Sequence, residues 1–118
     1  MDAISSKGDL LLRLLGATEL RAKVISGNLA NQNTPGYTRR EVHFEDLLRK
    51  ARRTGEQLSR VAPQITPDLE TPARPDGNNV TLELELNALR ENRLLYETYA
   101  AILEGRFGLL QAAITESR

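Results

Sequence analysis

The sequence predicts an all-α protein in which two long helices, one near each terminus, pair as a coiled-coil-like hairpin. Apolar residues recur every three to four positions over residues 10–33 and again over residues 80–116, and no proline interrupts either stretch. Between them, residues 51–79 hold four of the five prolines and no aromatic residue. Because such a segment buries little apolar surface, we expect a long, proline-rich and partly disordered connection.

The first helix is expected over residues 10–33, after a flexible N-terminus of residues 1–9. The apolar positions that repeat along one face of this helix are Leu11, Leu15, Ala22, Ile25 and Leu29, with Thr18 between them. A flanking row consists of Leu10, Leu14, Ala17 and Val24. Because this apolar face is wider than one helix–helix contact requires, we expect the helix to contact more than one partner helix.

The second helix is expected over residues 80–116, with Thr81 as its N-terminal cap. Stepping alternately by four and three residues from Leu82 meets an apolar side chain at nine of ten positions. These nine are Leu82, Leu86, Leu89, Tyr96, Ala100, Leu103, Phe107, Leu110 and Ile114. We call the repeating apolar positions of both helices the assembly seam, because a two-helix hairpin cannot bury faces this wide and other chains are expected to cover them.

The composition argues against a nucleic-acid-binding or enzymatic function. Sixteen basic and sixteen acidic residues cancel, whereas a nucleic-acid-binding domain is usually clearly basic. With no cysteine and one histidine, the sequence predicts no catalytic, metal or cofactor site and no small-molecule substrate. The N-terminus also lacks the basic and then apolar pattern of a cleavable secretory signal.

Residues 34–50 are expected to form a turn followed by a short helix. Phe44, Leu47 and Leu48 lie at positions i, i+3 and i+4, so they share one face of that helix. They either pack as a satellite helix on the hairpin or form a short linear motif that is read while the chain is unfolded.

The most specific motif spans the end of the first helix and the turn that follows it. It comprises Asn28, Leu29, Ala30, Asn31, Gln32, Asn33, Thr34, Pro35, Gly36 and Tyr37. The residue before a proline avoids helical dihedrals, and Pro35-Gly36 suits a type II turn because glycine accepts a positive φ. The asparagines can satisfy the unpaired backbone groups at the end of the helix.

This motif resembles the N-terminal signature of bacterial flagellar rod, hook and hook-associated proteins, S-x-N-[IL]-A-N-x-[NT]-T-P-G-[YF]. Every fixed position is filled from Ser26 to Tyr37. Residues 76–83 (DGNNVTLE), with RLLYE at residues 93–97, are similar to the C-terminal pattern of the proximal rod members, although Thr81 replaces the usual aspartate. The resemblance covers residues 8–48 and 76–115.

The resemblance implies one rod-type domain over residues 1–118, a structural and non-enzymatic subunit of the hollow rod of the flagellar basal body. It implies as partners other copies of the chain, other rod proteins, the adaptor at the rod base and the flagellar type III export gate. Export by that route to the periplasmic rod needs no cleavable signal peptide. Phe44, with Leu48 four residues later, matches the pattern shared by early export substrates and is the candidate export-gate motif.

Two other functions compete with this interpretation. A cytoplasmic coiled-coil adaptor or export chaperone would not need the asparagine-rich turn. A peptidoglycan-cutting enzyme would need a pair of carboxylates in a folded cleft, whereas the acidic residues here lie along the predicted helices.

Overall fold

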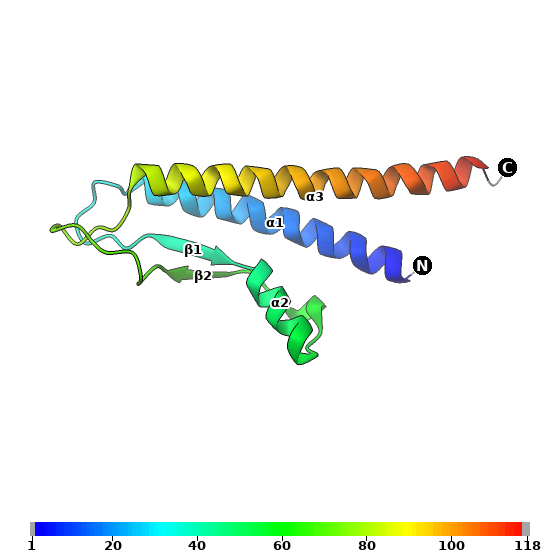
Figure 1. Cartoon of the computed structure of the whole chain (residues 1–118), viewed down its shortest axis with the longest axis horizontal. Coiled ribbons are helices and arrows are strands. Elements are labelled where there is room, and N and C mark those ends of the chain that lie inside the picture. The colour runs from blue at the N-terminus through cyan, green and yellow to red at the C-terminus, as the bar shows by residue number, and fades with distance from the viewer. Residues whose placement is uncertain (1, 117–118) are drawn as a thin grey trace.

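The computed structural model describes the backbone of residues 2–116 and the side chains of residues 7–116. Its elements are α1 (Asp2–Ala30), β1 (Arg40–His43), α2 (Glu45–Thr54), the 3-10 turn η1 (Leu58–Arg60), β2 (Gln64–Pro67) and α3 (Leu82–Glu116). Helices α1 and α3 lie side by side and run in opposite directions (Figure 1). The start of α1 and the end of α3 therefore lie toward the same end of an elongated molecule of 68 × 29 × 15 Å.

The two long helices agree with the sequence-based prediction, apart from their N-terminal and C-terminal limits. Helix α1 begins at Asp2 and not at residue 10, so residues 2–9, expected to be flexible, form its first turns. It ends at Ala30, just before the turn. Helix α3 begins at Leu82, and the Leu84 N–H donates to Thr81 Oγ1 at 3.4 Å, which confirms the predicted cap.

The fold is not purely all-α, and the predicted disordered connection was wrong. Strands β1 and β2 pair antiparallel, with Arg40 opposite Pro67 and His43 opposite Gln64. We call residues 40–67, which hold both strands, α2 and η1, the arm. Hydrogen bonds of Arg40 and Glu45 to other elements help to hold the arm, and a count of apolar surface does not detect them.

The arm packs against α1 through a small apolar core. Its buried members are Ala17, Phe44 and Leu48, and the half-buried side chains around them are Leu10, Leu14, Leu58 and Val61. The Arg13 guanidinium lies 5.5 Å from the centre of the Phe44 ring and donates to the carbonyls of Leu58 and Val61. Helix α1 thus lies between α3 and the arm, which confirms that it contacts more than one partner (Figure 1).

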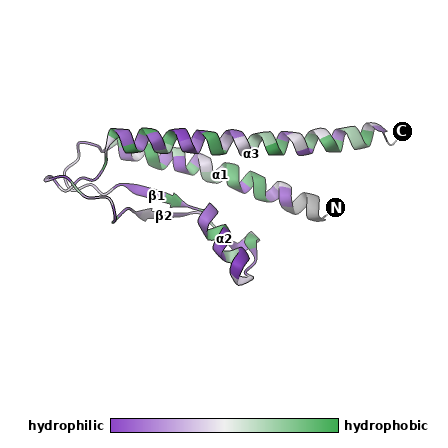
Figure 2. Cartoon of the chain, in the orientation of Figure 1, coloured by the Kyte–Doolittle hydropathy of each residue, from purple (hydrophilic) through white to green (hydrophobic). Residues whose placement is uncertain are grey.

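The C-terminal part of α3 is the most exposed apolar region among the described residues. Figure 2 shows apolar residues recurring along α3 toward its C-terminal end. The exposed large apolar side chains of α3 are Leu82, Leu86, Leu94, Tyr96, Ile102, Phe107, Leu109, Leu110 and Ile114. None of the described helices combines the length and the hydropathy that crossing a bilayer requires.

Candidate functional site

The two sequence motifs, residues 26–37 and 76–83, meet where α1 ends and α3 begins (Figure 1). The Gly36 N–H donates to the Asp76 carbonyl at 2.8 Å. Gly36 and Gly77 both have positive φ, 76° and 85°, and a Cβ added to Gly77 would lie 3.2 Å from Gly36 Cα. Glycine at these positions lets the two turns touch through their backbones. We call residues 28–41 and 68–85 the signature junction.

Asparagines close the end of α1, as the sequence predicts. Asn31 Nδ2 donates to the Gly27 carbonyl at 2.8 Å. Asn78 Nδ2, from the second motif, donates to the carbonyls of Asn31 and Thr34, each at 2.8 Å. Across Pro35-Gly36, the Tyr37 N–H donates to the Thr34 carbonyl at 3.2 Å, which confirms the turn.

Asn28 joins three elements of the fold from a fully buried position. Its Oδ1 accepts from the Arg40 N–H at 2.9 Å and from the Tyr37 hydroxyl at 3.2 Å. Its Nδ2 donates to the Arg40 carbonyl at 2.9 Å and to Glu85 Oε2 at 3.1 Å. Because only an amide side chain offers two donors and two lone pairs here, asparagine links α1, β1 and α3 with none of its groups unpaired.

Asn79 links separate segments of the chain at the second motif, as Asn28 does at the first. Its Oδ1 accepts from the Arg39 N–H at 2.7 Å. Its Nδ2 donates to the Asp68 carbonyl at 2.9 Å and to the Thr71 carbonyl at 3.3 Å. The side chain therefore ties the start of β1 to the segment that follows β2.

Arg39 is the charged centre of the junction. Its Nε donates to Glu85 Oε1 at 2.6 Å and its Nη1 to Asp68 Oδ2 at 2.7 Å, with all three side chains at most 6% exposed. Burial alone would lower the pKa of Arg39, but the hydrogen bonds to Glu85 and Asp68 raise it above its ordinary value. Arg39 therefore stays charged.

Asp68 balances that charge from the segment after β2. Burial alone would raise the pKa of Asp68, but hydrogen bonds from Thr71 and Arg39 hold it below its usual range. Among the described residues, every buried side-chain nitrogen or oxygen has a hydrogen-bond partner. The junction is thus a closed polar network with a fixed geometry.

Sequence reasoning did not single out Arg39, Asp68 or Glu85 as site residues. The three residues lie 29 and 17 positions apart, so no local spacing connects them. A single charged residue in a sequence is far more often exposed than buried. The one available signal is that Arg39 and Glu85 each lie two residues after one of the motifs.

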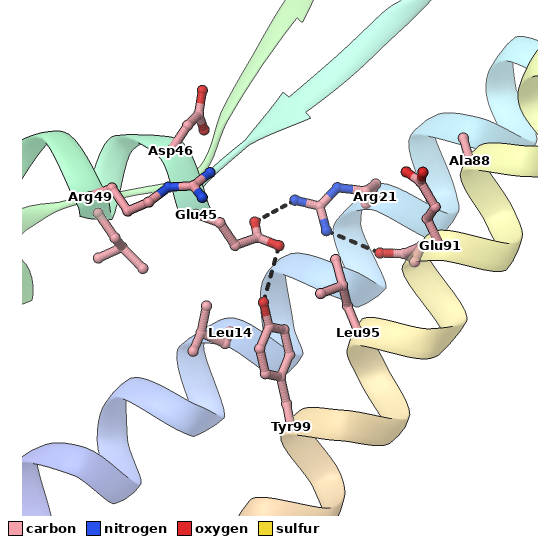
Figure 3. A pocket seen from close by; sticks show the side chains of 11 residues that line it. Leu14, Arg21, Glu45, Asp46, Arg49, Ala88, Glu91, Leu95 and Tyr99 are labelled. Carbon is pink, nitrogen blue, oxygen red and sulfur yellow. Dashed lines mark hydrogen bonds and ion pairs between the residues drawn. The ribbon is translucent and has the colours of Figure 1, made fainter.

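A second polar cluster joins all three helices (Figure 3). Arg21 donates to Glu45 Oε1 at 2.6 Å and to Asn92 Oδ1 at 3.1 Å. The Tyr99 hydroxyl donates to Glu45 Oε2 at 3.2 Å, and burial together with the charge of Glu45 raises the pKa of Tyr99 to about 12. Asn92 Nδ2 donates to the Thr18 carbonyl at 2.8 Å. These bonds set the angle between the arm and the hairpin.

The α1 half of the assembly seam lies inside the molecule. Its buried positions are Leu11, Thr18 and Ile25, and its half-buried positions are Leu15, Ala22 and Leu29. In α3, by contrast, the polar residues Glu85 and Asn92 are buried against α1. The helices pair as predicted, but the contact face of α3 is not its apolar stripe.

The α3 half of the seam occupies the neighbouring face of the helix. Its half-buried positions are Leu89, Ala100 and Leu103. Its exposed positions are Leu82, Leu86, Tyr96, Phe107, Leu110 and Ile114. Which surface covers these residues in an assembly stays a prediction.

The candidate export-gate residues lie in the apolar core of the arm. Phe44 is fully buried and Leu48 is 8% exposed. In the folded chain Leu48 lies on α2 and Phe44 directly precedes it, and both pack against α1, as in the satellite-helix alternative. A linear motif acts on the unfolded chain, so the export role stays a prediction.

The described residues bring together no catalytic constellation that we recognise, and they hold no cluster of three His, Cys, Asp or Glu side chains that could hold a metal ion. The charged groups of Arg39, Asp68 and Glu85 are each engaged by at least two hydrogen bonds and are buried. The arrangement can therefore fix the geometry of two helices and present their outer surfaces.

Comparison with known proteins identifies the family. No family model matches the chain. The chain is 32% identical to the flagellar basal body rod protein FlgB of Aeromonas hydrophila over 83% of this chain and 85% of that one. The protein of the same name from Aquifex aeolicus is 30% identical over 90% of each chain, and that from Bacillus subtilis 26% over 86% and 87%. At this identity, over most of both chains, the protein belongs to the flagellar basal body rod protein FlgB family.

Proposed function

We propose that this protein is a structural subunit of the proximal rod of the bacterial flagellar basal body and has no enzymatic activity. The names of its relatives support a place in the basal-body rod. Copies of the chain assemble through their terminal helices into part of the hollow shaft that serves motility. One rod-type domain, residues 1–118, carries this function.

The observation that supports the proposal most is the difference between the two ends of the hairpin. One end is held by buried hydrogen bonds, and the other exposes apolar side chains. The signature junction locks the first motif to the second through buried hydrogen bonds. At the other end, α3 exposes Phe107, Leu110 and Ile114 to solvent. A rigid helical hairpin with an exposed apolar stripe suits a subunit whose stability and position depend on its neighbours.

The partners that we propose are other copies of the chain, the other rod proteins, the adaptor at the rod base and the flagellar type III export gate. The subunit reaches the periplasmic rod through that gate without a cleavable signal peptide. It binds neither nucleic acid nor a small-molecule substrate. No cofactor is required for this function.

The location of the protein tests the proposal. Cells that carry an epitope-tagged copy should contain the protein in purified basal bodies, and cells without it should be non-motile and lack a rod. A cytoplasmic adaptor or export chaperone would be absent from basal bodies that are otherwise complete. That result would overturn the rod function.

Replacing both Phe44 and Leu48 by alanine tests the export role. We expect less secreted subunit at unchanged expression, because the export gate would read these side chains in the unfolded chain. The same change also removes buried apolar groups from the arm, so Leu14→Ala serves as the matched control that weakens the same core outside the motif. Normal secretion of the double variant, with failed assembly, would show that the pair is purely structural.

A further inference from the structure

A groove of about 600 Å³ lies between α1, α2 and α3 (Figure 3). Its floor includes Leu14 of α1 and Leu95 of α3, beside the ring of Tyr99. Its rims are charged, because Arg49 of α2 lies on one side and Glu91 of α3 on the other. Arg21, Glu45 and Asn92 also line the groove, but their polar groups are paired with one another. The apolar part of the floor, between charged rims, suits the apolar face of a helix.

The last part of α3 presents such a face. Phe107, Leu110 and Ile114 follow one another at intervals of three and four residues and are 61%, 47% and 61% exposed. This spacing places their side chains on one side of the helix. The stripe therefore has the form of the apolar anchors that seat a helix in a groove.

The stripe and the groove of one chain cannot meet. Helix α3 is continuous from Leu82 to Glu116, and Leu95 in the groove is about 22 Å along its axis from Leu110, at the usual rise per residue. The two surfaces are thus separate parts of one molecule. A second copy of the chain can bring them into contact.

The charges beside the two surfaces are complementary. On the α2 side, Arg49 lines the groove beside the carboxylate of Asp46, and Arg52 and Arg53 are further exposed basic residues of the same helix. On α3, the exposed carboxylate of Glu104 lies one turn before Phe107, at the edge of the stripe. A helix end seated in the groove can thus place a carboxylate beside the basic rim.

We propose that the C-terminal part of α3, residues 103–114, docks in the groove between α1, α2 and α3 of the next copy. Phe107 and Leu110 pack over Leu95 and Tyr99, and Glu104 lies beside Arg49. This arrangement rests on the proposed rod function and names the two surfaces that meet. Because the surfaces differ, the contact is head-to-tail, and each copy offers one stripe and one groove to the growing assembly.

Disulfide cross-linking tests this contact directly, because the natural chain has no cysteine. Full-length Leu95→Cys and Leu110→Cys variants are purified separately, mixed at high concentration and oxidised, and the same pair is co-expressed and oxidised in isolated basal bodies. The matched control replaces Leu95→Cys by Leu94→Cys, whose position is 65% exposed and absent from the groove lining. We expect about tenfold more linked dimer from the groove pair than from the control.

Charge reversal tests the predicted orientation. Arg49→Glu and Glu104→Arg should each lower the self-association constant by about three- to tenfold, and combining both in one chain should restore it. Lys50→Glu is the matched control, because Lys50 is the next residue of α2 and does not line the groove. Circular dichroism checks that each variant keeps its helices.

The outcomes separate this proposal from the rod function. If the protein is found in basal bodies but the groove pair links no better than the control, the docking arrangement is wrong and the rod function stands. If the double charge reversal fails to restore association, the pairing of Glu104 with Arg49 is wrong. If the protein is absent from basal bodies, the rod function itself fails.

Discussion

The two ends of the helical hairpin are built on opposite principles. At the signature junction, polar side chains such as Asn28, Arg39 and Glu85 are buried and hydrogen-bonded. At the far end of α3, Phe107 and Leu109 are 61% and 75% exposed. Hydrogen bonds are directional and allow one geometry, whereas apolar contacts adapt to the surface that covers them. The junction therefore fixes the subunit, and the exposed end is left for contacts between chains.

Removing the Glu85 carboxylate should lower the free energy of unfolding more than any other change to the junction considered below. Glu85→Ala leaves the Arg39 charge buried with one carboxylate fewer, and breaking a buried ion pair in this way costs about 3–5 kcal/mol. Urea unfolding monitored by circular dichroism measures the loss. Glu83→Ala, an exposed change in the same helical turn, should cost less than about 0.5 kcal/mol. Equal losses in both variants would contradict a special role for the junction.

Gly77→Ala should have the next largest effect on the junction. A left-handed backbone costs a residue with a Cβ about 1–2 kcal/mol, and here the added Cβ would also lie 3.2 Å from Gly36 Cα. Thermal unfolding should show a lower midpoint. Gly16→Ala, in the interior of α1 with open space around it, should change stability in the opposite direction, by about 0.5–1 kcal/mol. A stabilised Gly77→Ala variant would refute the close contact between the turns.

Acid should weaken the junction through Asp68. The pKa of Asp68 in the folded chain lies below its unfolded value of about 3.9, so its contribution is complete above that pH and is lost as the pH falls toward the folded pKa. Unfolding free energies measured from about pH 6 to pH 3 should therefore decline below about pH 4. Asp68→Asn should be less stable at neutral pH and should show a shallower decline. If the stability of Asp68→Asn falls with pH as steeply as that of the natural chain, Asp68 does not cause the loss in acid.

Phe107→Asp should have the smallest effect on the isolated subunit and still abolish assembly. The side chain is exposed, so the free energy of unfolding should change by less than about 0.5 kcal/mol. In a rod, the new carboxylate would be buried without a partner, and the same loss would recur in every copy. Basal-body imaging with an immunoblot of secreted subunit should show export without rods. Intact rods in this variant, matching an Ala101→Asp control on another face of α3, would show that the stripe is not a contact surface.

The parts of the fold that follow from local rules could be predicted from the sequence. Hydrophobic periodicity predicts both long helices, the wide apolar face of α1 predicts its second partner, and Thr81 and Pro35-Gly36 predict a cap and a turn. Each of these signals lies within about ten residues of the structure that it specifies. The family motifs likewise occupy two short segments.

The parts that depend on distant polar residues could not be predicted in this way. Strands β1 and β2 are four residues long and their ordering involves Asn79 and Asp68, which composition alone marks as loop residues. In α3, the polar residues Glu85 and Asn92 face α1, so the apolar period marks the neighbouring face. Burial of a polar residue depends on which partners the fold brings to it, and no local pattern records that.

The span of the junction along the chain also sets the order in which the protein can fold. Its hydrogen bonds join residues that are 57, 46 and 47 positions apart. Closing the junction therefore requires a long loop, whose conformational entropy is lost before the hydrogen bonds form. A chain that leaves a ribosome or a narrow channel with its N-terminus first holds Asn28 and Arg39 early and Glu85 only late. Until then the junction stays open, although α1 can already pack against the arm. This high contact order delays closure of the junction until the start of α3 has emerged.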